Sequence, residues 1–332
     1  MGGQQSLSGK VHGLSKSRIT AFEQCPKKLW LSVHRRDLAE TQAQSELRFA
    51  AGHQVGAIAC DLVPGGVMVE AQPDLRAALE QTTNLLASGH KGPIYEATFV
   101  HDGVLVQVDI LEPTPAGNWK MAEVKSSTGV KDYHLGDLAT QIWVLEGCGI
   151  EIEAATIRHI DTGFVLTEPK NYDGLLRDAH LLDAVRPIAE SRTDIVSKAR
   201  ETLAGGEPSV DVGAHCTKPF SCEFQAYCGK NQPQPPEWPI DILPRMGRRL
   251  ADEMAQEGVF DLRELSVDFL KKPQHRIVHQ ATVSGIPYHD PAGAMKATEN
   301  WRFPRHYLDF ETIALPVPAW IGTRPYQQVP FQ

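Results

Sequence analysis

Three strand-like runs separated by short turns occupy the middle of the chain, and a helical run and a further strand follow them. The helical run has leucine and isoleucine at helical spacing, whereas the runs around it are short and rich in β-branched residues. In chain order the segments are Ile94–Val100, Val104–Leu111, Trp119–Lys125, Asp132–Glu146 and Ala154–His159. The order strand, strand, strand, helix, strand predicts a mixed α/β core.

Helices are expected in the sequence before and after this core. Apolar residues at helical spacing predict helices at Ser17–Arg36, Ser45–Leu62, 74–88 and 173–204. The polar, proline-rich stretch Lys230–Pro239 is the best domain boundary in the chain. After it, residues 241–272 resemble a small helical unit and Arg305–Ile313 resembles a new strand.

These elements predict four regions. A large domain covers residues 15–230, a linker covers 231–240, a small helical region covers 241–300 and a last region covers 301–332. With 332 residues the chain is long enough for one large domain and a smaller partner.

Composition and charge narrow the function classes. The chain is 42% hydrophobic and 22% charged, which is typical of globular proteins, and no apolar run reaches the roughly 18 residues of a membrane helix. The polar start MGGQQSLSGK lacks the apolar core of a signal peptide, so we expect a cytoplasmic protein with no membrane partner. A net charge of −8 argues against a passive DNA coat but not against a nuclease, whose metal site needs carboxylates.

Two acids and a lysine are predicted to lie on one face of a hairpin. Alternation along the strand puts Glu123 and Lys125 on the same side, and a turn near Pro115 places Asp109 opposite residues 121–123. Cross-strand neighbours lie about 5 Å apart, so the two carboxylates can share one divalent cation. Lys125 would then offset phosphate charge and help to orient or deprotonate the attacking water, which is the chemistry of phosphodiester hydrolysis. The alternative is a set of solvated charges on an exposed hairpin.

Four cysteines form a second candidate site. Cys216, Cys222 and Cys228 are evenly spaced in HCTKPFSCEFQAYC, and Cys25 stands far upstream in FEQCPKK. In a reducing compartment such a set is typical of metal binding rather than of disulfides. Spacing alone leaves zinc and an iron-sulfur cluster both open.

The chain resembles the PD-(D/E)XK nucleases over about residues 15–230, in particular the RecB-like branch that includes the iron-sulfur exonucleases associated with CRISPR systems. In family order, the matching motifs are GHQVG (Gly52–Gly56), VDIL (Val108–Leu111), EVKSS (Glu123–Ser127) and QIWVL (Gln141–Leu145). Val108 replaces the proline of the family motif, and Leu145 replaces a tyrosine. The resemblance implies a restriction-endonuclease-like mixed sheet flanked by helices.

It also implies roles for individual residues. His53, Asp109 and Glu123 would bind Mg or Mn, Lys125 would be the catalytic lysine, and Gln141 would position substrate or lysine. Glu96 is either a further ligand or an ordinary surface acid. A lone histidine on a helix, such as His53, is more often a packed or surface residue than a ligand.

For the cysteines, the resemblance implies a [4Fe-4S] cluster on Cys25, Cys216, Cys222 and Cys228 that joins the N- and C-terminal segments of the domain. The even spacing differs from the tighter first pair of the CRISPR-associated branch. The neighbouring Lys27, Lys28, Arg35 and Arg36 would either contact DNA phosphates or form a solvated helix face.

Near the C-terminus, RHYLDFETI (Arg305–Ile313) resembles the first motif of DnaQ-like exonucleases of the DEDD type. Its acids, Asp309 and Glu311, would bind metal in a complete domain. We expect residues 301–332 to be the truncated start of such a domain and its acids to be catalytically silent here.

Together these features predict a metal-dependent DNA nuclease that acts as an exonuclease on single-stranded ends. The alternative from another class is a non-catalytic iron-sulfur or zinc module for DNA binding or assembly.

Overall fold

The structure is a computed structural model that describes residues 13–40, 44–70, 74–230, 236–245 and 247–332. The chain forms two compact units: residues up to Lys230 together with Phe310–Gln332, and Asn231–Asp309. The first boundary falls at the start of the proline-rich stretch; residues 231–235 of the predicted linker lie outside the described residues. Within the described chain, every helix is too short or too polar to cross a bilayer.

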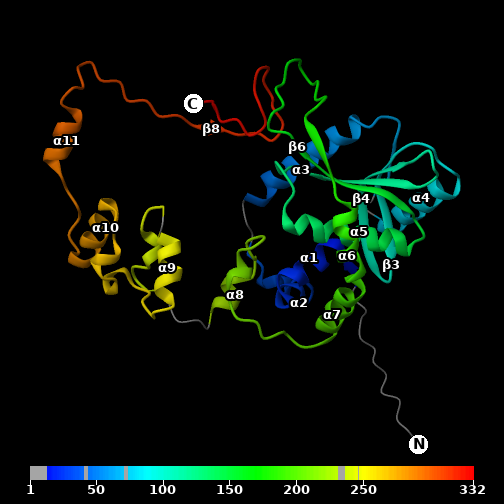
Figure 1. The fold of residues 1–332 in the computed structure, drawn as a ribbon, viewed down its shortest axis with the longest axis horizontal. Coiled ribbons are helices and arrows are strands. Elements are labelled where there is room, and N and C mark those ends of the chain that lie inside the picture. Colours follow the sequence, from blue (N-terminus) through cyan, green and yellow to red (C-terminus); the bar gives the residue numbers. More distant parts are fainter. Residues whose placement is uncertain (1–12, 41–43, 71–73, 231–235, 246) are drawn as a thin grey trace, which may run out of the picture. The chain divides into compact units, whose positions relative to one another are not determined.

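A mixed sheet forms the centre of the first unit (Figure 1). Within the described residues its strands are β1 (Leu14–Ser15), β2 (Val67–Met68), β3 (Ile94–His101), β4 (Val104–Pro113), β5 (Trp119–Lys125), β6 (Ile152–Ile160) and β7 (Leu176–His180). Their order is β2-β3-β4-β5-β6-β7, and β1 pairs with β4. β3, β4 and β5 form an antiparallel meander, whereas β5 and β6 are parallel because a helix connects them. This confirms the predicted mixed α/β core.

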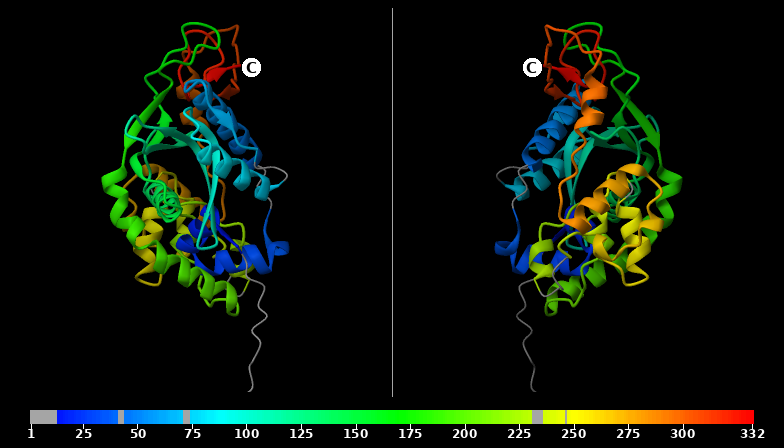
Figure 2. Two further views of the ribbon diagram at one scale, coloured as in Figure 1. Left: turned by 90° about the vertical axis from the view of Figure 1, so that its right-hand side faces the viewer. Right: turned by 90° about the vertical axis from the view of Figure 1, so that its left-hand side faces the viewer.

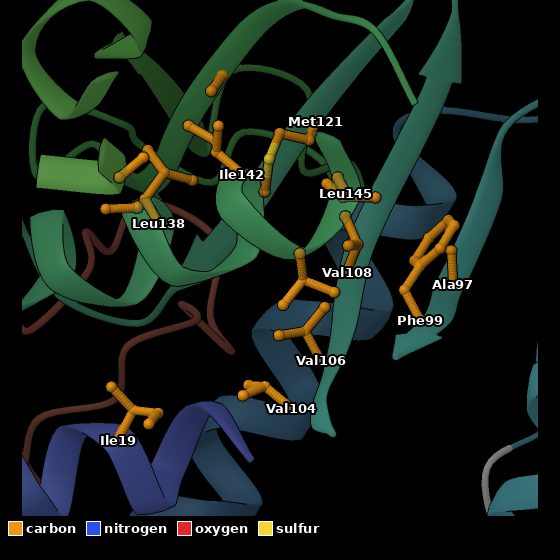
Figure 3. Packing of buried hydrophobic residues seen from close by; sticks show 14 of the residues in the cluster. Ile19, Ala97, Phe99, Val104, Val106, Val108, Met121, Leu138, Ile142 and Leu145 are labelled. Atoms are coloured by element: carbon orange, nitrogen blue, oxygen red, sulfur yellow. The ribbon is translucent and has the colours of Figure 1, made fainter. Parts of the chain in front are cut away.

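Helices flank the sheet on both sides. They are α1 (Lys16–Gln24), α2 (Pro26–His34), α3 (Gln44–Asp61), α4 (Leu75–Ala87), α5 (Asp132–Gly147), α6 (Leu182–Glu190) and α7 (Arg192–Ala204). The largest apolar cluster joins α1, α5 and α7 to one side of the sheet; Figure 3 shows Leu138, Ile142 and Leu145 of α5 packed against the valines of β4. α3 packs against the opposite side, where Ala59 meets residues of β3, β4 and β5.

Two predicted helices differ from the observed elements. The helix predicted over Ser17–Arg36 is divided at Cys25, because Pro26 lacks an amide N–H and takes the first position of a new helix. The range 173–204 begins with the strand β7 and not with a helix. Leu176–His180 lacks apolar alternation, and its pairing with β6, reinforced by the Arg158–Asp178 ion pair, determines its conformation.

The C-terminal segment of the first unit crosses the end of the sheet. Val317 is buried among Val55, Ile160 and their neighbours, and Leu166 exchanges backbone hydrogen bonds with Gly322 and Thr323. Figure 2 shows this red segment beside the green loop that follows β6. Of the strand predicted over Arg305–Ile313, only β8 (Thr312–Ile313) forms, paired with β9 (Val329–Pro330).

The second unit is a small helical body with its own apolar core. It contains α9 (Gly247–Ala255), α10 (Pro273–Ser284) and α11 (Pro291–Thr298), and single-turn segments contribute Ile240, Leu262 and Leu270 to the core. Its helices extend beyond the 241–272 range predicted for the helical unit.

Candidate functional site

Three acids lie in one row across the central strands. The residue pairs on either side place Glu96 of β3 opposite Asp109 of β4. The last β4–β5 pair is Ile110 with Ala122, so Asp109 and Glu123 face each other where the strands separate. The predicted position of Asp109 opposite residues 121–123 is therefore correct.

The carboxylate of Asp109 takes the place of a backbone acceptor at this point. Its Oδ2 accepts a hydrogen bond of 2.6 Å from the backbone N–H of Val124. The Asp109 side chain thus adds one more hydrogen bond between β4 and β5 beyond their last backbone pair. The bond orients Asp109 toward the end of β5 that carries Glu123.

The alternation of apolar residues along β4 shifts by one residue next to Asp109. Val108 and Leu111 both join the cluster under α5, whereas Ile110 joins the cluster under α3. Strict alternation would put Val108 and Ile110 on one face of the sheet, whereas the structure puts them in clusters on opposite faces. On the neighbouring strand Glu96 has a φ of +55°, a left-handed conformation that costs a non-glycine residue about 1 kcal/mol or more.

Glu123 is the centre of the cluster. It is 2% exposed; its Oε1 accepts hydrogen bonds from Lys16 Nζ at 2.6 Å and Lys125 Nζ at 2.8 Å. Its Oε2 accepts a third bond, of 2.7 Å, from Gln141 Nε2 on α5. Burial opposes ionisation, but the two ammonium groups outweigh it and lower the pKa of Glu123 to about 2. Glu123 is therefore a fully charged carboxylate.

Lys125 has a second carboxylate partner. Its Nζ donates to Asp137 Oδ2 at 3.2 Å, and Asp137 Oδ1 accepts a bond of 2.8 Å from Thr20 on α1. Burial lowers the pKa of Lys125, yet Glu123 and Asp137 together raise it well above its ordinary value. Lys125 therefore stays protonated in this arrangement. It is suited to stabilising negative charge and orienting groups, and it is not suited to deprotonating water.

Asp109 has the opposite electrostatic environment. Burial, followed by the repulsion of Glu123, raises the pKa of Asp109 to about 7, and Lys16 and the Val124 N–H offset this only in part. Burial and Glu123 also raise the pKa of Glu96, while Lys16 and His53 lower it. The row of acids therefore remains short of positive charge on the Asp109 side.

Some predicted residues lie apart from this cluster or have another role. His53 is exposed on α3 and acts on Glu96 electrostatically. Gln141 is fully buried and holds Glu123, and within the described chain its Oε1 has no hydrogen-bond partner. Leu145, where the family motif has tyrosine, is fully buried in the main apolar cluster and so is out of reach of DNA.

Three residues of the cluster were not predicted: Lys16, Thr20 and Asp137. Lys16 begins α1, which Ser15 caps through a hydrogen bond to Arg18. The short strand β1 pairs with the start of β4, and this pairing anchors the beginning of α1 beside the sheet. Nothing in the local sequence around Lys16 signals that contact, because it depends on the tertiary fold.

The four predicted cysteines line a single cavity. Cys25 lies at the break between α1 and α2, and Cys216, Cys222 and Cys228 come from the segment after α7. Apolar side chains complete much of the wall: Leu31, Val210, Val212 and Phe224. All four are free thiols. Residues nearly two hundred positions apart are thus brought together.

Gln24 fastens the cysteine segment to α1. Its Nε2 donates to the carbonyl oxygens of His215 at 2.8 Å and Phe220 at 2.7 Å. Lys27 forms an ion pair with Glu207 and Lys28 with Glu223. These two lysines therefore have acidic partners within the chain, and burial of their stems beside the cavity removes them from a freely solvated face.

Across the described residues, no three His, Cys, Asp or Glu side chains stand close enough together to form a ready metal-binding group. The acids are distributed along a row and interleaved with lysines, and the thiols face a shared cavity without forming a closed ligand set. The metal and cluster assignments therefore remain predictions.

The acids of the C-terminal motif belong to the segment around β8. Glu311 exchanges backbone hydrogen bonds with Phe331 and Gln332, and Asp309 ends the second unit.

Comparisons with known proteins leave the site unassigned. A family model described as a domain of unknown function (DUF2779) matches residues 306–332. A solved structure titled "Crystal structure of SSO0001" aligns with 67% of this chain and 89% of its own, at 14% identity and a TM-score of 0.30. No curated protein matches the chain. Neither match shows a nuclease family.

Asp109 offers a test of the electrostatics without any metal. Its pKa is raised from 3.8 to about 7, so between these values the folded state keeps a proton that the unfolded chain has released, and stability falls as pH rises. We expect Asp109→Asn to stabilise the protein by about 2 kcal/mol near pH 8 and by little near pH 4. Urea unfolding in EDTA measures the difference. The exposed Asp173→Asn is the control, and an equal gain at both pH values would contradict the assignment.

Proposed function

We propose that the first unit is a metal-dependent DNA nuclease that hydrolyses phosphodiester bonds. The observation that carries the proposal is the meeting of Asp109 and Glu123 on adjacent strands, with Lys125 bonded to Glu123. Acid, acid and lysine therefore converge as the sequence motifs predict. A preference for single-stranded ends rests on the family resemblance alone.

The residues present suit a divalent cation. Asp109 and Glu123 supply oxygen donors, which Mg and Mn prefer; Glu96 lies opposite Asp109, and His53 acts on Glu96 electrostatically. Burial, and after it the repulsion of Glu123, raises the pKa of Asp109, so a bound cation would favour the ionised carboxylate. When bound there, Mg or Mn would polarise the phosphate and make a water molecule more acidic.

The chain's own residues would do the rest. Lys125, which stays protonated, would stabilise the negative charge that builds up on the phosphate. Gln141 would keep Glu123 in one orientation through its hydrogen bond to Oε2. Asp137, held by Thr20, would fix the position of Lys125. Because Lys125 stays protonated, the proton of the attacking water would pass to an acceptor other than Lys125.

We further propose that the cysteine cavity holds a [4Fe-4S] cluster. Four free thiols in one partly apolar cavity match the donor set of such a cluster. Burial raises the pKa values of Cys222 and Cys228, while Lys28 and Lys27, respectively, lower them and so favour the thiolate. Cys25, Cys216, Cys222 and Cys228 would be the ligands.

A cleavage assay tests the nuclease proposal. The protein, purified without oxygen, is incubated with Mn and with single- or double-stranded DNA labelled at either end, and a parallel reaction contains EDTA. We expect Mn-dependent release of short products from single-stranded DNA. Binding of single-stranded DNA without turnover in either Mn or Mg would instead support the non-catalytic module.

Asp309 should be dispensable for this activity. We expect Asp309→Ala and Glu311→Ala to cleave within about twofold of wild type, because neither residue belongs to the set of Asp109, Glu123 and Lys125 that the proposal makes the active site. The readout is the initial rate in the Mn assay. Activity lost in Asp309→Ala but kept in Lys125→Ala would move the active site to the C-terminal motif.

A further inference from the structure

We propose that Lys16 is a built-in counter-charge that competes with the divalent cation for Glu123, and so sets the cation concentration at which the site assembles. The inference rests on the proposed function, because it assumes that Glu123 is a ligand. It concerns a residue that neither the sequence motifs nor the comparisons single out.

The oxygen atoms of Glu123 are already heavily used. A carboxylate oxygen accepts about two hydrogen bonds, and Oε1 accepts one from Lys16 and one from Lys125. Oε2 accepts one from Gln141. A cation that approaches Glu123 therefore meets two ammonium groups at Oε1, and it gains access there only if one of them moves.

Lys125 and Lys16 differ in what else holds them. Lys125 also bonds to Asp137, which Thr20 braces, so a second carboxylate holds its ammonium in place beside Glu123. Within the described residues, the Lys16 ammonium donates to Glu123 only. The contact that a cation replaces at lowest structural cost is therefore the one from Lys16.

The position of Lys16 allows that movement. It is the first residue of α1, and its side chain is 23% exposed, so a change of rotamer takes the ammonium toward solvent without moving the backbone. Lys125 lies instead on a central strand of the sheet. At a short distance and in a partly buried site, one positive charge opposes a divalent cation strongly.

Manganese binding without DNA tests the competition directly. The affinity of the full chain for Mn is measured by calorimetry and by the loss of the free-Mn paramagnetic resonance signal. We expect Lys16→Met to bind Mn at least about tenfold more tightly than wild type. Lys16→Arg, which keeps the charge, should bind as weakly as wild type. Lys120→Met, which removes an exposed positive charge from the same strand as Glu123, is the matched control and should change affinity less than about twofold.

The outcomes separate this inference from the proposed function. If wild type binds Mn and Glu123→Gln abolishes that binding, the site is a cation site; equal or weaker affinity in Lys16→Met then overturns the competition alone. If Mn affinity is the same in wild type and Glu123→Gln, both proposals fail. Lys16→Gln is a second variant of neutral charge, and thermal unfolding of every variant in EDTA shows that the fold persists.

Discussion

Replacing Lys125 with alanine is expected to lower the rate of Mn-dependent DNA cleavage by about 10²–10³-fold. Lys125 is the protonated group that bridges Glu123 and Asp137, so it is the main fixed positive charge available to a phosphate at this site. The variant should still fold, because Lys16 continues to neutralise Glu123 at 2.6 Å. The loss should therefore appear in the maximal rate more than in the affinity for DNA.

The measurement is a single-turnover rate on end-labelled single-stranded DNA, with thermal unfolding recorded for the same preparation. Lys120→Ala is the matched control, because it removes an exposed lysine from the same strand. A wild-type rate in Lys125→Ala would show that the acid, acid, lysine set is not the active site. The variant also tests the role of Lys125. Because the pKa of Lys125 is raised, its ammonium should stay charged at neutral and alkaline pH, and the substitution should lower the rate by the same factor at both.

The second large effect is expected at the cysteine cavity. Cys216 is 6% exposed and lies beside Cys25, Cys222 and Cys228 in the cavity wall. If the proposed cluster is bound, Cys216→Ser should abolish iron incorporation and lower the melting temperature by about 10 °C, because binding of the cluster would contribute directly to folding. The protein should change from brown to colourless.

Cys148→Ser provides the comparison, since Cys148 is exposed and lies outside the cavity wall. It should keep both the colour and the melting temperature. Iron and zinc are quantified in the same samples. A colourless wild-type protein with one zinc per chain would replace the cluster by a zinc site, and a metal-free, fully stable protein would exclude both.

Much of the central sheet could be predicted because its signals are local. Apolar alternation and the proline-glycine turn determine β4 and β5, and the turn length brings Asp109 opposite Glu123. Strict alternation fails at Glu96, whose backbone is left-handed. It also fails after Val108, where the apolar pattern of β4 shifts by one residue. Such a departure is set by the surrounding packing, and strict alternation has no means of anticipating it.

The partners of the predicted residues could not be found in the same way. Lys16, Thr20 and Asp137 come from two helices, and only the packing of α1 against α5 brings them to Glu123 and Lys125. By contrast, spacing grouped Cys216, Cys222 and Cys228, the family resemblance added Cys25, and the structure places all four in one cavity wall. Residue type helped to predict which side chains meet when that type is rare, as for cysteine. It gave no such help for lysines and acids, which are common.

Helix α1 touches both candidate sites, and this has a consequence for the order of folding. Its first residue, Lys16, reaches Glu123 over a sequence separation of 107, and its last, Gln24, reaches His215 and Phe220 over 191 and 196. During synthesis, β5 therefore emerges well before the cysteine segment. The Lys16 end of α1 can pack on the sheet before the partners of Gln24 have been synthesised. The contacts of Gln24 close the longer loop, so their formation is slower and costs more entropy. Ribosome-bound chains stopped before residue 215 should thus hold the acids and lysines together while the cysteine end of α1 remains open to exchange with solvent.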